Sequence, residues 1–260
     1  MSTNQTEANT VNPGNPDKLN PVIRIEKLKK SFSRQEVLIN MSLNLYDGEN
    51  LVVLGKSGSG KSVLIKCIVG LLAADSGTIR VFDNNIATMT RQELGEMRQK
   101  IGFLFQSGAL YDSMTVKQNM EFPLRRTKRD LTEKEINDKV HEVLENVGLA
   151  DALHKMPSQL SGGMRKRISL ARTIISDPLI MLYDEPTTGL DPVTSDEISE
   201  LINEVQKKYK TSSIIITHDI RCARHTANRV IMLRDGDVYA EGGVTDFENS
   251  ADPVLQSFFR

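Results

Sequence analysis

The stretch LVVLGKSGSGKSVLIKCIVGLL, residues 51–72, decides the fold of this chain. Its opening residues are continuously apolar, which predicts a strand buried on both faces, and the apolar run after residue 62 follows as the next element. Between them, GKSGSGKS at 55–62 matches the G-x-x-x-x-G-K-[ST] spacing of a phosphate-binding loop in the strand–loop–helix context that this motif requires. The sequence therefore predicts nucleotide binding, and a glycine-rich turn with an incidental lysine explains little of the pattern.

Each residue type in this loop has a chemical reason. The glycines let backbone N–H groups approach phosphates, Lys61 supplies a positive charge to the β and γ phosphates, and Ser62 offers a hydroxyl to Mg²⁺. The predicted phosphate-binding residues are Gly55, Lys56, Ser57, Gly58, Ser59, Gly60, Lys61 and Ser62.

Two other apolar runs, residues 179–183 and 213–217, are predicted strands that end in chemically active side chains. The first continues into Asp184 and Glu185 and the second into His218, at the sheet edge where open α/β folds bind ligands. On their own, paired acids are more often a helix cap and a lone histidine is more often structural. Beside a phosphate loop, we expect Asp184 to hold Mg²⁺ through water, Glu185 to polarise the attacking water, and His218 to contact the γ-phosphate.

The rest of the chain predicts the architecture around this core. Apolar and polar residues alternate at 22–28, 41–46 and 78–82, which is typical of half-buried antiparallel strands. Residues 131–149 have helical spacing, with Thr132 and Glu135 as a capping box and Gly148 as the stop. We predict an α/β fold: a P-loop NTPase core with a parallel sheet, an N-terminal antiparallel β subdomain and an α-helical subdomain inserted at about 107–170. The expected division is a disordered tail (1–20), an ATPase domain (21–245) and a C-terminal extension (246–260).

Composition excludes several classes of function. The chain has 260 residues and a formal net charge of -1, so no global basic field predicts nucleic acid or an anionic membrane surface as a partner. Cys67 and Cys222 lack paired metal spacing, which fits a reducing compartment, and the Cys222-x-x-His225 pair has no second half. The N-terminus lacks the pattern of a signal peptide. No stretch reaches the roughly 20 apolar residues of a membrane span, so we expect any membrane role to come through a partner.

Seven elements in a fixed order identify a family. They are Phe32 in KKSFSRQEVL, GKSGSGKS, Gln106 in FLFQSG, LSGGM at 160–164, LIMLYDEP at 179–186, TGLD at 188–191 and THD at 217–219. From about residue 22 to 245 the chain resembles the ATP-binding subunits of ABC transporters. This resemblance implies the ABC ATPase fold, ATP and Mg²⁺ as ligands, and hydrolysis of ATP to ADP and phosphate.

The resemblance also implies roles for residues outside the phosphate loop. Phe32 would stack on adenine, although Tyr is the commoner residue there. Gln106 would link the γ-phosphate and Mg²⁺ to the transmembrane partner, and Asp191 would organise the subunit interface.

The LSGGM motif has a physical meaning of its own. A basic amphipathic stretch, predicted to be a helix, follows Ser161, Gly162 and Gly163. Unpaired backbone N–H groups and the positive end of the helix dipole can therefore bind an anion there. By resemblance, these residues clamp the γ-phosphate of ATP bound by the opposite subunit. This implies a homodimer with two ATP molecules sandwiched head to tail.

Two longer stretches narrow the resemblance. Residues 105–126 and 156–172 are similar to the ATPase subunit of Mla-type phospholipid transporters of Gram-negative bacteria, including Met164 where the wider family mostly has Gln. Met164 removes a polar side chain near the neighbour's nucleotide without implying inactivity. The resemblance implies an MlaE-type permease, an MCE-domain lipid-binding protein, phospholipid cargo, and a position on the cytoplasmic face of the inner membrane with membrane contact through the permease alone.

Alternatives stay open for the function and for two segments of the chain. An importer of amino acids or other small solutes has an ATPase with the same nucleotide motifs, whereas a soluble ABC protein acting on ribosomes or DNA usually has two cassettes or a long coiled coil, neither of which is present. In residues 108–116, the side chains of Leu110, Tyr111, Met114 and Val116 suit a groove for a short helix of a membrane partner, or else pack the lobe's own core. The C-terminal PVLQSFF packs either on its own domain or on a partner.

Overall fold

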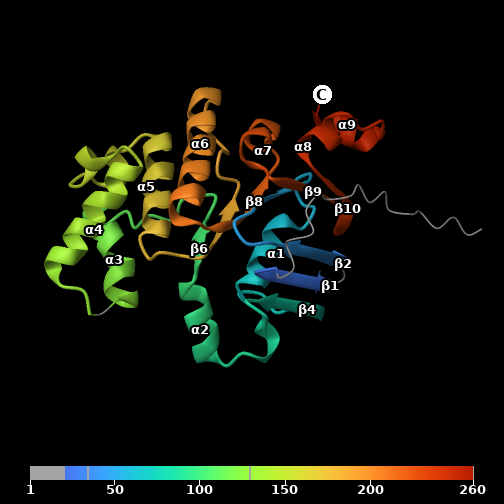
Figure 1. The fold of residues 1–260 in the computed structure, drawn as a ribbon, viewed down its shortest axis with the longest axis horizontal. Coiled ribbons are helices and arrows are strands. Elements are labelled where there is room, and N and C mark those ends of the chain that lie inside the picture. Colours follow the sequence, from blue (N-terminus) through green and yellow to red (C-terminus); the bar gives the residue numbers. More distant parts are fainter. Residues whose placement is uncertain (1–20, 34, 129, 260) are drawn as a thin grey trace, which may run out of the picture.

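The computed structural model describes residues 21–33, 35–128 and 130–259; the predicted disordered tail at 1–20 lies outside them. Figure 1 shows the elements in chain order. The first half contains β1 (Ile23–Phe32), β2 (Gln35–Leu45), β3 (Asn50–Leu54), α1 (Lys61–Ile68), β4 (Ser76–Val81), β5 (Asn84–Asn85), α2 (Arg91–Gln99), β6 (Ile101–Leu104), α3 (Val116–Thr127) and α4 (Glu133–Asn146). The second half contains α5 (Gly162–Ile174), β7 (Ile180–Asp184), α6 (Pro192–Tyr209), β8 (Ser212–Thr217), α7 (Ile220–Thr226), β9 (Arg229–Arg234), β10 (Asp237–Gly242), α8 (Val244–Glu248) and α9 (Pro253–Phe259).

The central sheet has six strands in the order β10-β9-β3-β8-β7-β6. Its pairs from β9 to β6 are parallel, and β10 is antiparallel to β9. Every residue of β3, β7 and β8 is buried, as their continuous apolar runs predict. The predicted parallel core is therefore confirmed.

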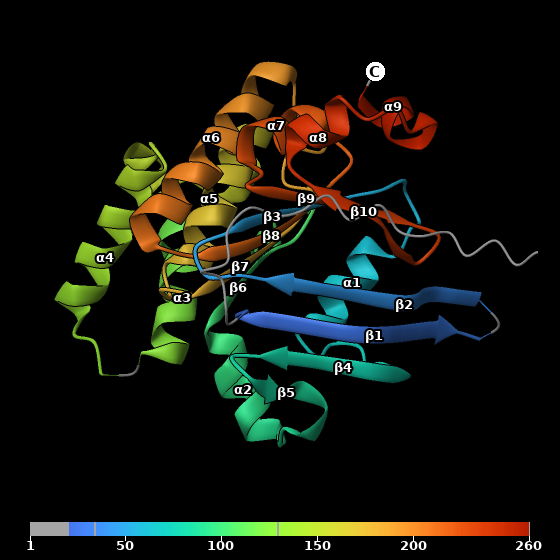
Figure 2. The same cartoon turned by 45° about the vertical axis from the view of Figure 1, so that its right-hand side comes forward.

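The second sheet is antiparallel and has the order β2-β1-β4-β5. Its alternating pattern buries one face: Ile23 pairs with Leu45 and Ile25 with Leu43, and all four side chains are buried. Figure 2 shows this sheet lying across α1 from the central sheet. The buried face joins α1 and one face of the central sheet in a single apolar cluster, which fixes the phosphate loop between two rigid layers.

Helices α3, α4 and α5 lie together at one end of the molecule (Figure 1). The predicted capping box is present at the start of α4, where Thr132 and Glu135 bond each other's backbone N–H. The buried side chains of this lobe belong to the same apolar cluster as Val52, Leu104 and Tyr183 of the central sheet. The helical subdomain thus shares a continuous core with the sheet, and its boundary at about 107 stays a prediction.

The C-terminal helices α8 and α9 pack on the chain itself. Leu255 is buried, and the rings of Phe247 and Phe259 lie 5.9 Å apart. Of the two alternatives for PVLQSFF, the structure shows packing on its own domain. None of the helices within the described ranges combines the length and the apolarity needed to cross a membrane.

Candidate functional site

The carboxyl ends of β3, β6, β7 and β8 meet at one edge of the central sheet, as parallel pairing requires. A cavity of about 840 Å³ opens there. It is lined by Val37, Lys56, Ser57, Gly58, Gly60, Lys61, Ser62, Val63, Gln106, Glu185, His218, Ser257 and Phe258. The structure therefore gathers most of the predicted phosphate loop with the predicted glutamine, glutamate and histidine around one cavity.

The phosphate loop needs glycine at two positions for steric reasons. Gly60 has φ +100°, and a Cβ there would lie 2.8 Å from Leu38 Cδ2. A Cβ on Gly55 would lie 2.6 Å from the carbonyl oxygen of Leu233. Leu38 lies on β2 and Leu233 on β9, so the loop is wedged between the two sheets.

Lys61 begins α1 and directs its ammonium into the loop. Its Nζ donates to the carbonyl oxygens of Gly55 at 2.7 Å and Lys56 at 3.0 Å. Burial lowers the pKa of Lys61, while the charges of Glu185 and Asp184 oppose this shift. The positive charge of Lys61 is thus held inside the loop, where it would interact with the phosphates of a bound polyphosphate.

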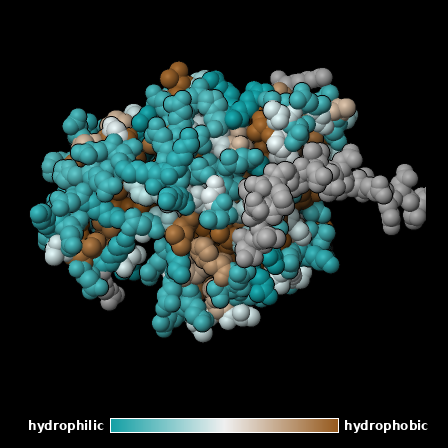
Figure 3. Space-filling view, viewed as in Figure 1, coloured by the Kyte–Doolittle hydropathy of each residue, from teal (hydrophilic) through white to brown (hydrophobic). Residues whose placement is uncertain are grey.

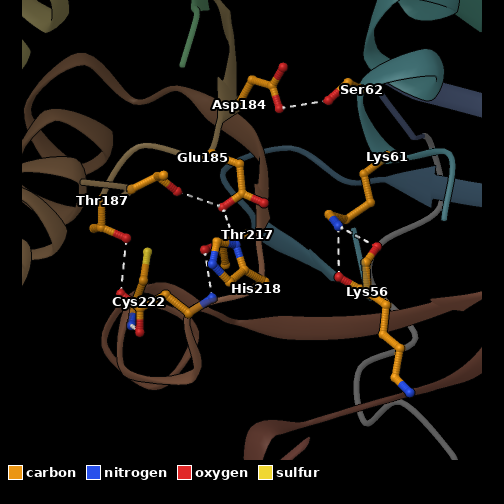
Figure 4. Close-up of polar contacts among 12 residues, drawn as sticks. Lys56, Lys61, Ser62, Asp184, Glu185, Thr187, Thr217, His218 and Cys222 are labelled. Atoms are coloured by element: carbon orange, nitrogen blue, oxygen red, sulfur yellow. Dashed lines mark hydrogen bonds and ion pairs between the residues drawn. The ribbon is translucent and has the colours of Figure 1, made fainter. Parts of the chain in front are cut away.

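Ser62 and Asp184 form the candidate magnesium site. Ser62 Oγ donates to Asp184 Oδ1 at 3.1 Å (Figure 4). Burial raises the pKa of Asp184, against the hydrogen bond from Ser62. Mg²⁺ prefers oxygen ligands and usually keeps several of its waters, so a hydroxyl beside a carboxylate could hold it, the carboxylate through water. The oxygen chemistry of this pair fits Mg²⁺ shared with phosphate oxygens.

The other metal-ligand pattern considered in the sequence is the Cys222-x-x-His225 pair. Cys222 is buried and His225 is exposed, so the two side chains of the C-x-x-H pair lie in different environments. Across the described ranges, no group of three or more His, Cys, Asp or Glu side chains is arranged to hold a metal ion.

Glu185 directly follows β7 and has the left-handed φ of +52°. Its Oε2 lies 2.8 Å from His218 Nδ1 (Figure 4). The same oxygen accepts a hydrogen bond from Thr188 Oγ1 at 3.1 Å. A non-glycine residue in this region costs about 1–3 kcal/mol and persists only where its surroundings fix it. The carboxylate is consequently aimed by a strained backbone and two side chains, which suits a group that must orient one water molecule.

His218 is held by the loop that follows β8. Asp219 caps α7 through the N–H groups of Arg221 and Cys222, and accepts from Thr187 Oγ1 at 2.9 Å. Thr187 therefore connects the segment after β7 to the segment after β8, whereas Thr188 bonds Glu185 within the first of these segments. Sequence reasoning gave no role to Thr187, because a threonine after an acidic pair carries no distinctive signal.

The second glycine-rich segment lies away from the cavity. Ser161 is the N-cap of α5, and its Oγ accepts from Met164 N at 3.2 Å. A Cβ on Gly163 would lie 2.6 Å from Thr194 Cγ2, so this segment packs against the start of α6. Asp191 caps α6, accepting from the N–H groups of Val193 and Thr194 at 3.1 Å each.

Seven of the predicted nucleotide contacts do not line the cavity: Phe32, Gly55, Ser59, Ser161, Gly162, Gly163 and Asp191. Phe32 is exposed at the end of β1, with Lys30 Nζ 5.4 Å from its ring centroid. Its contact with adenine stays a prediction. Instead Val37 and the C-terminal Ser257 and Phe258 line the cavity, and these were missed because nothing in the sequence relates the end of the chain to the phosphate loop.

The segment 108–116 is held in place by the buried Asn119. Its side chain accepts from Tyr111 N at 2.8 Å and donates to the carbonyl oxygens of Tyr111, Met114 and Thr115. Tyr111 is exposed, whereas Leu110 packs against the core and Val116 is buried in it. The expectation of a partner surface is wrong for Val116, because the first turn of α3 uses it to anchor the lobe.

Comparisons with known proteins agree with this geometry. The profile of the ABC transporter family matches residues 38–188. The "Probable ribonucleotide transport ATP-binding protein mkl" of Mycobacterium leprae is 39% identical over 237 residues, which are 91% of this chain and 68% of that protein. The "Methionine import ATP-binding protein MetN" of Rhizobium etli is 38% identical over 237 residues, which are 91% of this chain and 65% of that protein. The chain spans about two thirds of the length of these curated relatives.

Solved structures show the same fold. A dimeric post-hydrolysis state of the ATP-binding cassette MJ0796, bound to ADP and Pi, has a TM-score of 0.78 and 30% identity, covering 85% of this chain and 98% of that one. The structure of cbiO1 from Clostridium perfringens, part of the ABC transporter complex cbiONQ, has a TM-score of 0.81 and 29% identity, covering 92% of this chain and 95% of that one. The chain therefore belongs to the ABC transporter family, as an ATP-binding subunit with the fold and the ATPase activity of that family.

Proposed function

We propose that two copies of this chain sandwich two ATP molecules and hydrolyse them to drive a permease that moves phospholipid. One observation supports the dimer. A phosphate loop, two candidate metal ligands and a candidate base lie together at the cavity, whereas the second cradle at 161–163 packs on α6 outside it. A cradle without a base or metal ligand beside it serves a nucleotide held elsewhere. The related cassette bound to ADP and Pi is itself dimeric.

The residues of the cavity divide the work of hydrolysis. The loop N–H groups and Lys61 bind the β and γ phosphates, and Ser62 with Asp184 would hold Mg²⁺. When bound, Mg²⁺ neutralises the charge on the phosphate oxygens. Glu185 orients the attacking water and takes up its proton, while His218 keeps the carboxylate in place and faces the γ-phosphate.

A groove beside Gln106 is the proposed permease contact. Its volume is about 330 Å³, and it is lined by side chains of α2, β6, α3 and α5, among them Phe103, Phe105 and Arg172. The Phe103 and Phe105 rings stack at 3.9 Å, and Figure 3 shows apolar side chains gathered between the helical lobe and α2. An amphipathic helix of the permease seated here would press on the backbone that carries Gln106.

The cargo rests on the resemblance of residues 105–126 and 156–172 to Mla-type ATPases. Under this proposal the partners are an MlaE-type permease and an MCE-domain lipid-binding protein, and the subunit lies on the cytoplasmic face of the inner membrane. The relatives named for ribonucleotide transport and methionine import support the alternative of a small-solute importer.

Purification of the tagged chain from detergent-solubilised membranes of its source separates these cargoes. Mass spectrometry of the captured proteins and lipids should find an MlaE-like permease, an MCE-domain protein and stoichiometric phospholipid. A different permease without lipid would discard the cargo and keep the ATPase.

The groove is tested in the same purification. Phe105→Glu should reduce permease recovery about tenfold or more, because it places an unpaired charge in the apolar contact. Ile39→Glu is the matched control, since Ile39 and Phe105 are both 38% exposed and Ile39 lies on β2, outside the groove. Equal recovery with both variants would rule out the groove as the contact.

A further inference from the structure

Lys166 is a buried cation next to the catalytic residues, although no predicted role involves it. It lies on α5, one turn after Gly162, and its residue surface is only 7% exposed. Burial lowers its pKa, while the negative charges of Asp184 and Glu185 oppose this. Lysine is almost never buried unless its charge is compensated. Its position therefore needs a reason.

The ammonium of Lys166 bridges two strand ends. Its Nζ donates to the backbone carbonyl of Gln106 at 2.6 Å and to that of Glu185 at 3.3 Å. Gln106 follows β6 and Glu185 follows β7, which are parallel neighbours in the central sheet. A single side chain of α5 thus holds the backbones of Gln106 and Glu185, both of which are expected to act at the γ-phosphate.

The contact with Glu185 matters because that residue is strained. Its φ of +52° is unfavourable, and its N–H donates to Ile216 O at 2.9 Å. Lys166 binds the carbonyl on the other side of the same residue. The two hydrogen bonds hold the peptide groups on either side of the strained Cα of Glu185, so the direction of the Glu185 carboxylate depends on both.

We infer that Lys166 is a positioning residue for hydrolysis at its own chain's site, and that it transmits the position of α5 to Gln106 and Glu185. This inference rests on the proposed function. The N-terminus of α5 is the cradle proposed to clamp ATP held by the partner. When α5 shifts on that ATP, Lys166 moves the two carbonyls at the chain's own ATP. The two sites of the dimer are thereby coupled through one side chain.

Mixed dimers in the purified transporter complex test this inference. Two differently tagged copies are co-expressed with the permease, and each dimer carries Glu185→Gln in one copy, so that one site hydrolyses. Lys166→Met is placed either in the copy that keeps Glu185 or in the copy that carries Glu185→Gln. Both dimers contain the same substitutions, so a general loss of stability affects them equally.

Single-turnover hydrolysis is the readout. With Lys166→Met beside the intact Glu185, the rate constant should fall about 10- to 100-fold with ATP affinity within about twofold, because misplacing a catalytic group by about 1 Å costs about 10²-fold. With Lys166→Met in the other copy, the rate should match the dimer with Glu185→Gln alone. Lys134→Met, an exposed lysine of α4, is the control.

Equal rates in the two arrangements would overturn the inference. A parallel loss of ATP affinity and rate would also overturn it, since that pattern marks a structural role. Wild-type hydrolysis by a dimer with Glu185→Gln in both copies would instead refute the role given to Glu185, whatever Lys166 does.

Discussion

Two helices of the chain begin at glycine-rich segments, 55–62 and 161–163. The two segments share the chemistry of a phosphate cradle but differ in their surroundings. The first is wedged between two sheets, with Lys61 inside it and Asp184 in contact with Ser62. The second is open to the surface, is capped by Ser161, and rests on the start of α6. Both offer backbone N–H groups to an anion.

The difference shows that a phosphate cradle becomes a catalytic site through its neighbours. The loop at 55–62 lies at a sheet edge where two candidate metal ligands, Ser62 and Asp184, and the candidate base Glu185 converge, so it can support hydrolysis. The segment at 161–163 has no candidate metal ligand or base beside it, so under the proposed function it clamps a phosphate without hydrolysing it. Since both belong to one chain, the comparison implies that a second copy completes each site.

The largest expected effect separates binding from hydrolysis. Glu185→Gln should lower kcat by about 10²- to 10⁴-fold, the usual contribution of a general base. Both cradles stay intact, so ATP binding should persist and the dimer should stay closed, as measured by steady-state ATPase assays and by size-exclusion chromatography with ATP. Hydrolysis at the wild-type rate would show that Glu185 is not the base.

Removal of the loop's own charge should distinguish the two cradles. Lys61→Ala loses charge-assisted contacts worth about 1.5–3 kcal/mol, which is about a 10- to 100-fold rise in the Kd for ATP. Ser161→Ala is the matched change in the second cradle, and it should leave the Kd of a dilute single chain unchanged in titration calorimetry. A similar rise in both variants would mean that both segments bind the same ATP.

Glycine substitutions sharpen the contrast in packing. Gly60→Ala forces an alanine to φ +100° against Leu38, and a left-handed residue costs about 1–2 kcal/mol, so Tm should fall by about 2–8 °C. Gly162→Ala places its Cβ 3.5 Å from Leu190, an ordinary contact, and should leave Tm within about 1 °C. Differential scanning calorimetry measures both, and equal losses would mean that Gly162 is as tightly packed as Gly60.

The smallest effect concerns the support of the second cradle. Hydrogen bonds from Thr194 lower the pKa of Asp191 in the folded chain. Its stabilising effect is therefore complete above the unfolded pKa of about 4 and is lost as pH falls through the lower folded value. Asp191→Ala should lower Tm by about 2–4 °C at pH 7, and the difference from wild type should shrink below about pH 4. A pH-independent difference would exclude the charge of Asp191 as the cause.

Much of the catalytic edge could be predicted from the sequence, because buried parallel strands are continuously apolar and the motifs follow them directly. The strands β6, β9 and β10 escaped prediction, since β6 is short and β9 and β10 include charged residues. In the sequence, Lys166 cannot be distinguished from the surface cations of a basic helix, because only tertiary packing buries it. Phe258 lies about 200 positions from the phosphate loop, and no periodic pattern joins such distant segments.

If the two cradles of one chain serve two different ATP molecules, one pair of mixed dimers will distinguish them. Each transporter complex carries one Ser161→Arg and one Glu185→Gln, either in the same copy or in different copies. With both in the same copy, the altered cradle faces the only site that can hydrolyse, and single-turnover hydrolysis should be lost. With Ser161→Arg in the copy that keeps Glu185, that site is clamped by an unaltered partner, and hydrolysis should persist. The reverse result, or equal rates, would contradict the account.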